Sequence, residues 1–310
     1  MDIVSVDGLR KSYGRVEALD GVTFGVGEGE MYGIIGPDGA GKTTLFRILA
    51  TLLLPDGGTA TVDGYDVRTG MRDIRRLIGY MPGRFSLYQD LSVEENLEFF
   101  ASVFNTSLSR NYDMVKGIYS QLEPFRTRRA GKLSGGMKQK LALCCALIHA
   151  PRVLLLDEPT TGVDPVSRKE FWSMLQRLRH DYGITIIAST PYMDEASWCD
   201  RISLVQDGSL LRTDTPDGIR RAYVGRLYAV RCADMRRLAV ALKECRAVAT
   251  SFSFGDSFHV TLSPGATVAG LDECLLRLGL GQVEISETSP SVEDCFMSLM
   301  GKDVGAESRT

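Results

Sequence analysis

The sequence has no uninterrupted apolar run of about 18 residues, the length that a helix needs to span a bilayer. Its first residues, which include Asp2 and Asp7, also lack the basic and apolar regions of a signal peptide. These absences predict that the chain does not cross a membrane itself, and that any membrane role depends on a partner protein. We therefore expect a cytoplasmic chain.

The sequence also lacks closely spaced C-x-x-C cysteines and an excess of basic residues. None of the seven cysteines forms a C-x-x-C pair, and their odd number argues against a closed disulfide framework. Reduced thiols are therefore expected. The net charge of -3 provides no basic field that would attract nucleic acid, so no nucleic-acid partner is predicted.

The sequence does contain a phosphate-binding loop, Gly36-Pro37-Asp38-Gly39-Ala40-Gly41-Lys42-Thr43-Thr44, which matches the pattern G-x-x-x-x-G-K-[ST]. The apolar segment 31–35 predicts a buried strand before the loop, and the periodicity of 45–49 predicts a helix after it. Backbone N–H groups of the loop would bind phosphate oxygens, Lys42 would bind the terminal phosphates, and the Thr43 hydroxyl would bind Mg²⁺. The alternative is a glycine-rich turn that matches by chance.

An acidic pair follows a second apolar segment. Residues 153–156 predict a strand buried on both faces, and Asp157 and Glu158 come directly after it, where open α/β sheets bind their ligands. We expect Asp157 to hold Mg²⁺ and Glu158 to orient or deprotonate the attacking water. The alternative is an acidic pair at the end of a strand that merely faces solvent.

Two weaker features fit the same ligand. Ser134, Gly135 and Gly136 open a predicted helix, whose hydroxyl and free N–H groups could cap a phosphate from outside. Ser134 could equally be an ordinary N-cap. Tyr13 could stack on an adenine, although an aromatic residue that covers a sheet edge would give the same pattern.

The order of the elements predicts an α/β protein with two domains. Residues 1–217 form the nucleotide-binding domain, with a helical subdomain at about 84–150 that includes the capping box of Ser92 and Glu95. Residues 218–301 have the order β-α-β-β-α-β followed by a helix, which predicts a small ferredoxin-like α+β domain. The tail 302–310 is expected to be disordered.

With these motifs in one order, residues 1–217 resemble the ATP-binding subunit of an ATP-binding cassette (ABC) transporter, most closely the daunorubicin-resistance type of multidrug exporter. The phosphate loop is similar to the Walker A motif, 156–158 to Walker B, 133–139 to the signature motif and 161–164 to the D-loop. The resemblance implies a P-loop NTPase fold, ATP and Mg²⁺ as ligands, and hydrolysis of ATP to ADP and phosphate. It also implies transmembrane permease subunits that dock on the helical insertion around Phe85 to Phe104, at the inner face of the cell membrane.

Two positions depart from the family pattern. Gly83 stands where the family has a glutamine that reaches Mg²⁺ and the attacking water, and Pro191 stands where it has a histidine that contacts the γ-phosphate. Because ABC cassettes dimerise head to tail, these departures suggest a hydrolytically weak site in this chain and favour a heterodimer with a more complete cassette. The alternatives are a nucleotide-gated regulatory subunit and a soluble ABC protein of DNA repair or translation.

Overall fold

The computed structural model describes residues 2–84 and 86–307, with residues 301–307 described by their backbone alone. The chain divides into two units, Met1–Pro216 and Asp217–Thr310. Within the described ranges, no helix has the length and apolar character that crossing a membrane requires.

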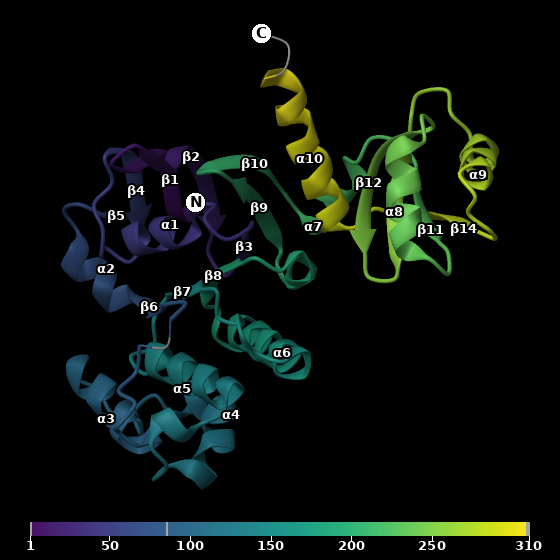
Figure 1. The fold of residues 1–310 in the computed structure, drawn as a ribbon. Helices are drawn as coiled ribbons and strands as arrows, with labels where there is room; N and C mark the ends of the chain where they lie inside the picture. Colours follow the sequence, from purple (N-terminus) through teal and green to yellow (C-terminus); the bar gives the residue numbers. More distant parts are fainter. Residues whose placement is uncertain (1, 85, 308–310) are drawn as a thin grey trace. The chain divides into compact units, whose positions relative to one another are not determined.

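A six-stranded sheet runs through the first unit (Figure 1). Its strand order is β10-β9-β3-β8-β7-β6, and all neighbouring pairs are parallel except β9 with β10. The three central strands are buried along their whole length, as the apolar segments of the sequence predict. The strands are β3 (Met31–Ile35), β6 (Ile78–Met81), β7 (Val153–Asp157), β8 (Thr185–Thr190), β9 (Arg201–Gln206) and β10 (Ser209–Asp214).

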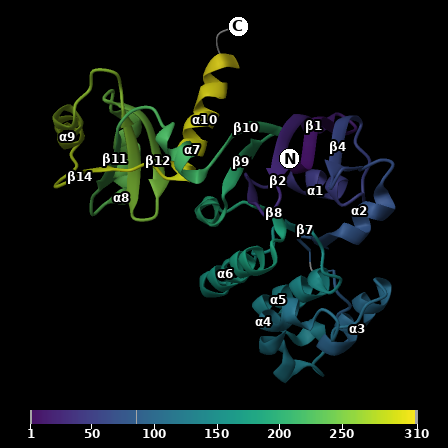
Figure 2. The same ribbon diagram turned by 180° about the vertical axis from the view of Figure 1, so that it is seen from behind.

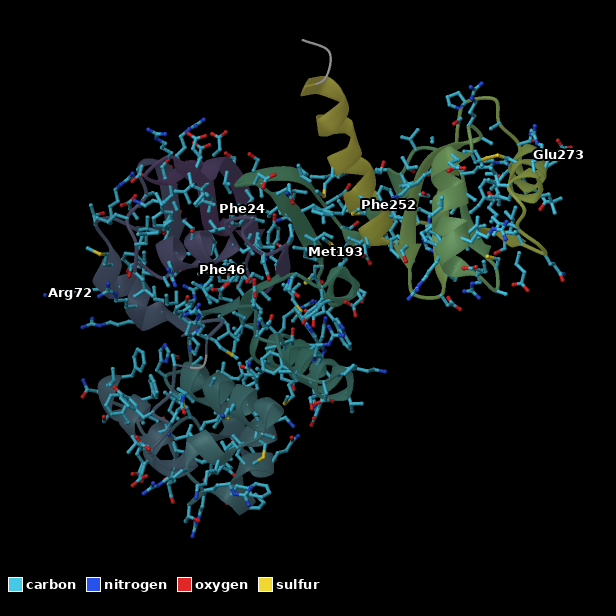
Figure 3. The ribbon with its side chains drawn as sticks, in the orientation of Figure 1. Phe24, Phe46, Arg72, Met193, Phe252 and Glu273 are labelled. Carbon is cyan, nitrogen blue, oxygen red and sulfur yellow. A yellow bond between two sulfur atoms is a disulfide. The ribbon has the colours of Figure 1, made fainter. Side chains whose placement is uncertain are left out.

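A second, antiparallel sheet has the order β2-β1-β4-β5. Helix α1 (Lys42–Leu49) shares a buried apolar cluster with both sheets, and Phe24 and Phe46 lie in this cluster (Figure 3). Arg72, on the neighbouring helix α2 (Met71–Leu77), instead extends into solvent. The strands of this sheet are β1 (Asp2–Tyr13), β2 (Val16–Gly27), β4 (Gly57–Val62) and β5 (Tyr65–Asp66). The sheets therefore hold α1, and with it the phosphate loop, in a fixed frame.

Three α-helices among the described residues between β6 and β7 form the expected helical insertion (Figures 1 and 2). They are α3 (Val93–Val103), α4 (Tyr112–Leu122) and α5 (Gly135–Leu147). The predicted capping box is present, because Ser92 accepts a hydrogen bond from the Glu95 N–H while the Glu95 carboxylate accepts one from the Ser92 N–H. Phe85 lies outside the described residues. Helix α6 (Pro165–Tyr182) and the short 3-10 helix η3 (Met193–Trp198) complete the unit.

The second unit contains an antiparallel sheet of order β12-β13-β11-β14. Helices α8 (Met235–Glu244) and α9 (Val268–Arg277) bury Leu238, Leu242 and Leu271 in its core. The element order confirms the predicted β-α-β-β-α-β arrangement: β11 (Leu227–Arg231), α8, β12 (Val248–Phe254), β13 (Ser257–Leu262), α9 and β14 (Glu284–Thr288). Helix α7 (Pro216–Arg221) precedes these elements.

Helix α10 (Val292–Glu307) continues through residues 302–307, which we had expected to be disordered, and residues 308–310 lie outside the described residues. No proline follows residue 300, and Gly301, a residue type that often ends a helix, is helical here.

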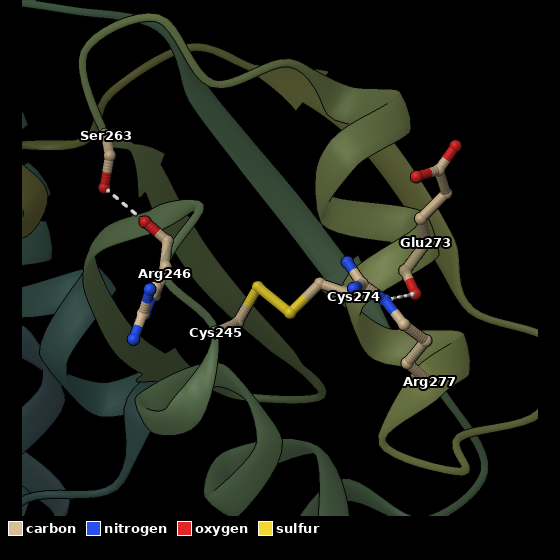
Figure 4. The surroundings of a disulfide bond; sticks show 6 residues. All are labelled: Cys245, Arg246, Ser263, Glu273, Cys274 and Arg277. Carbon is tan, nitrogen blue, oxygen red and sulfur yellow. Dashed lines mark hydrogen bonds between the residues drawn. A yellow bond between two sulfur atoms is a disulfide. The ribbon is translucent and has the colours of Figure 1, made fainter.

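The expectation of reduced thiols is wrong for one cysteine pair. Cys245 at the end of α8 and Cys274 on α9 form a disulfide with a Cα–Cα distance of 6.2 Å (Figure 4). The two cysteines are 29 residues apart in the sequence, and only the packing of α8 beside α9 brings them together. The other five cysteines form no disulfide.

Candidate functional site

The phosphate loop connects β3 to α1, and two of its glycines are required by close backbone contacts. A Cβ atom on Gly36 would lie 2.1 Å from the carbonyl oxygen of Val205, and one on Gly41 would lie 2.2 Å from that of Ala18. Gly41 also has a φ of +94°, a conformation that residues with a side chain rarely adopt. The loop therefore keeps this path only with glycine at both positions.

Lys42, the first residue of α1, is almost fully buried with 3% of its surface exposed. Its ammonium donates hydrogen bonds to the carbonyl oxygens of Gly36 and Pro37, both at 2.8 Å. It also forms an ion pair with Glu158, with 3.0 Å between Nζ and Oε1. The structure thus brings the Walker A lysine and the proposed catalytic carboxylate into direct contact.

Asp157 ends β7 and is 2% exposed. Its Oδ1 accepts a hydrogen bond from Ser189 Oγ at 2.8 Å, and the Thr43 side chain also hydrogen-bonds to it. Burial raises the pKa of Asp157 above its ordinary value, while the two hydroxyls act in the opposite direction. A buried carboxylate beside a threonine hydroxyl is an oxygen donor set that suits a hard divalent cation such as Mg²⁺.

This donor set is small. No group of three or more His, Cys, Asp or Glu side chains within residues 2–84 and 86–300 could hold a metal by itself. Mg²⁺ commonly keeps water and phosphate ligands beside one or two protein ligands, so Thr43 and Asp157 fit it as a metal that arrives with a nucleotide.

Glu158 has an unusual backbone. Its φ is +50°, in the left-handed region, and its N–H donates to both the carbonyl oxygen and the hydroxyl of Ser189, at 3.2 and 3.0 Å. Its Oε2 accepts a weak hydrogen bond from Thr161 Oγ1 at 3.4 Å. A non-glycine residue in this conformation costs about 1 kcal/mol or more, so the contacts with Ser189 hold it in place.

A cavity of about 220 Å³ lies above the loop. Its lining includes Tyr13, Lys42, Thr43 and Glu158, so the predicted adenine-stacking residue and the loop face the same space. Tyr13 is 47% exposed, as a stacking platform requires. The full lining is Tyr13, Ala18, Gly39, Gly41, Lys42, Thr43, Thr44 and Glu158. Of the remaining loop residues, Asp38 is exposed, Pro37 is partly buried and Ala40 is buried.

The signature residues do not line this cavity. Ser134 and Gly135 are exposed at the start of α5, and Ser134 Oγ accepts a hydrogen bond from the Met137 N–H at 3.4 Å. A Cβ atom on Gly136 would lie 3.2 Å from Ser167 Oγ, at the start of α6. Within one chain, therefore, the signature is separate from the phosphate loop.

Of the two departures from the family pattern, Gly83 lies beside the acidic residues and Pro191 follows the strand that pairs with theirs. Gly83 follows β6, and a Cβ atom added to it would lie 3.0 Å from the carbonyl oxygen of Asp157 and 3.7 Å from the Cβ of Glu158. Pro191 directly follows Thr190, the last residue of β8. Neither residue supplies a side-chain donor to the site.

Ser189, which hydrogen-bonds to Asp157 and Glu158, was not singled out from the sequence, nor was Glu195, which accepts hydrogen bonds from Thr160 and Thr190. The usable signal is a hydroxyl residue at the carboxyl end of the strand that neighbours the acidic one.

Known proteins resemble the chain at the level of sequence. Residues 19–161 match the family described as ABC transporter. The probable multidrug ABC transporter ATP-binding protein YbhF of Escherichia coli (strain K12) is 38% identical over 305 residues, which cover 96% of this chain and 52% of YbhF. The chain thus spans about half the length of that relative. The daunorubicin resistance ATP-binding protein DrrA2 of Streptomyces coeruleorubidus is 36% identical over 307 residues, which cover 96% of this chain and 95% of DrrA2.

Solved structures share the fold. The dimeric structure of a post-hydrolysis state of the ATP-binding cassette MJ0796 bound to ADP and Pi has a TM-score of 0.62 and 27% identity, covering 68% of this chain and 98% of that one. The cbiO1 protein of Clostridium perfringens, part of the ABC transporter complex cbiONQ, has a TM-score of 0.64 and 27% identity, covering 71% of this chain and 91% of that one.

Proposed function

The chain belongs to the ABC transporter family, and from that premise we propose that it is the ATP-binding subunit of an exporter, driven by ATP-dependent dimerisation. The observation that carries the proposal is the group of charges at the phosphate loop, where the buried Lys42 pairs with the strained, partly buried Glu158 and the buried Asp157 precedes it in the chain. This group supplies a cation for phosphate, a carboxylate for water and a pair of oxygens for a metal.

Each side chain has a role in the hydrolysis of ATP to ADP and phosphate. Lys42 binds the terminal phosphates, and Thr43 and Asp157 hold the metal. Bound Mg²⁺ would neutralise phosphate charge. Glu158 orients the attacking water and accepts its proton. Tyr13 stacks on the adenine, which explains an exposed ring at the edge of the cavity.

The remaining phosphate contacts come from a second cassette. Ser134 and Gly135 are exposed, Gly136 is partly buried, and none of them lines this chain's own cavity, which suits them to cap a nucleotide bound to the partner. The dimeric ADP-bound relative supports such an assembly. The chain alone therefore holds half of each site.

We further propose that this chain's own site turns over slowly. Gly83 leaves the space beside Asp157 and Glu158 without an amide, and Pro191 offers neither an imidazole nor a backbone donor. Missing transition-state contacts typically cost about a hundredfold or more in rate. The same observation favours a heterodimer with a more complete cassette, or a nucleotide-gated regulatory subunit as the second candidate.

A permease partner would hold the chain at the inner face of the membrane. A cavity of about 320 Å³ between the core and the helical insertion is lined mainly by apolar side chains, including Met81, Leu87 and Phe100. At its rim Leu52 and Val103 are 60% and 58% exposed. An apolar surface of this kind suits an apolar segment of a partner protein.

The test of hydrolytic competence compares ATP turnover by the unmodified chain, Glu158→Gln and the double variant Gly83→Gln, Pro191→His. We expect slow turnover by the unmodified chain and faster turnover by the double variant. Because a new Cβ at position 83 would press on the Asp157 carbonyl, Gly83→Ala is the matched control for that steric effect. Fast turnover by the unmodified chain, abolished by Glu158→Gln, would show that the site is competent and the weak-site proposal wrong.

A further inference from the structure

A buried carboxylate outside the nucleotide cavity joins two segments of the site. Glu195, on η3, is 3% exposed. Its Oε1 accepts a hydrogen bond from Thr160 Oγ1 at 2.8 Å, and its Oε2 accepts one from Thr190 Oγ1 at 2.5 Å. Thr160 lies in the loop that follows β7, whereas Thr190 is the last residue of β8. One carboxylate therefore ties the loop after β7 to the end of β8.

Arg168 of α6 provides the opposite charge. Its Nη1 lies 3.8 Å from Glu195 Oε1, and its guanidinium lies 4.4 Å from the centre of the Tyr192 ring. Nη1 of Arg168 has no hydrogen-bond partner among the described residues, so the ion pair with Glu195 is not an optimal one. Buried ion pairs of imperfect geometry often add little stability, and stability alone does not explain why this one is present.

The tied loop, residues 158–164, lies against functional groups through two neighbouring residues, Thr161 and Gly162. At its start, Thr161 contacts Glu158 through its backbone N–H and its hydroxyl. Further along, the carbonyl oxygen of Gly162 lies 3.7 Å from a Cβ placed on Gly135, in the signature. The loop thus lies between the proposed general base and the signature helix.

We propose that Glu195 is a positioning residue for ATP turnover. Its carboxylate fixes the loop 158–164, and with it Glu158 and the start of the signature helix, relative to the end of β8. It acts through Thr160 and Thr190 and makes no contact with the nucleotide. This inference rests on the proposed function, because it concerns the same site.

The test uses Glu195→Gln, which keeps the shape and removes the charge, and Thr160→Val, which removes only the hydroxyl on the loop side. Asp194→Asn is the matched control: it is the adjacent carboxylate, it also lies 3.8 Å from Arg168, and its side chain is 73% exposed against 4% for Glu195. ATP affinity is measured by calorimetry, hydrolysis in single turnover with the protein in excess, and folding by thermal denaturation.

We expect Glu195→Gln and Thr160→Val each to slow single-turnover hydrolysis by about tenfold, with ATP affinity changed by less than about threefold. Both changes break the same contact, so their effects should not add. The double variant Glu195→Gln, Thr160→Val should hydrolyse ATP within about twofold of the rate of the slower single variant. Asp194→Asn should match the unmodified chain. Equal effects of Asp194→Asn and Glu195→Gln, or additive effects in the double variant, would overturn the proposal.

If hydrolysis is too slow to measure, a second assay tests the proposal without it. In the Glu158→Gln background, ATP-dependent self-association reports on the signature helix, and Thr160→Val should weaken it by about fivefold. If ATP binds but neither turnover nor association responds to Thr160→Val, this inference fails while the proposed function stands. If the unmodified chain does not bind ATP, the proposed function itself fails.

Discussion

Replacing Glu158 by glutamine should tighten ATP binding, because a phosphate has to displace Glu158 from Lys42. The Lys42 ammonium has three N–H donors, and three oxygens lie within 3.0 Å of Nζ: the carbonyls of Gly36 and Pro37 and Oε1 of Glu158. The two carbonyls belong to the loop itself. Only Glu158, whose side chain is 20% exposed, can leave without rebuilding the loop.

The size of the effect follows from the ion pair. At 3.0 Å and an effective dielectric constant of about 20, Coulomb attraction is roughly 5 to 6 kcal/mol before other costs. Desolvation of a buried lysine and the ordering of the glutamate side chain leave a net of about 1 to 2 kcal/mol. Since each 1.4 kcal/mol is a factor of about ten, Glu158→Gln should bind ATP roughly five- to thirtyfold more tightly.

Calorimetric titration of both proteins with ATP, at low and high salt, checks this expectation. Asp38→Asn is the matched control, because Asp38 is an exposed loop carboxylate and its removal also subtracts one negative charge near the phosphates. Its effect should be small and should vanish at high salt, whereas that of Glu158→Gln should persist. Equal or weaker ATP binding by Glu158→Gln would refute the displacement argument.

Four further outcomes are expected. Lys42→Ala should weaken ATP binding by about a hundredfold or more in calorimetry, because it removes the charged phosphate contacts. Asp157→Asn should raise the melting temperature of the nucleotide-free chain, since burial raises the pKa of Asp157 and disfavours its charged form, yet it should abolish the Mg²⁺ dependence of ATP binding. Val103→Asp should prevent co-purification with membrane subunits, whereas Val240→Asp, on the second unit and equally exposed at 57% against 58%, should not. Burial lowers the pKa of His149 in the folded chain, so as the pH falls from about 7 to 5 this histidine takes up a proton in the unfolded chain before it does in the folded one. The folded chain loses stability over that pH range. His149→Phe should flatten that part of the pH–stability curve, measured by denaturant unfolding.

Much of the fold could be predicted because individual strands and helix starts are determined by patterns within short stretches of sequence. The segments 31–35 and 153–156 are continuous apolar runs, and both strands are buried at every residue. The capping box at Ser92 starts its helix at the expected place. The disulfide was missed for the opposite reason, since nothing local to Cys245 or Cys274 signals that α8 and α9 pack together.

The groups proposed to contact the nucleotide could be found by motif because their chemistry fixes a spacing along one stretch of chain. The residues that hold those groups have no such spacing. Ser189 is 32 residues from Asp157 and meets it because β7 and β8 are parallel neighbours with these two residues in register. In a parallel sheet a long crossover separates neighbouring strands, so sequence distance carries no information about this contact. Strand order and register do predict this contact, since the carboxyl ends of adjacent parallel strands share one edge of the sheet. Once 153–157 and 185–190 are taken as neighbouring strands, a hydroxyl at the end of the second becomes the natural partner of a buried carboxylate at the end of the first, and Ser189 follows.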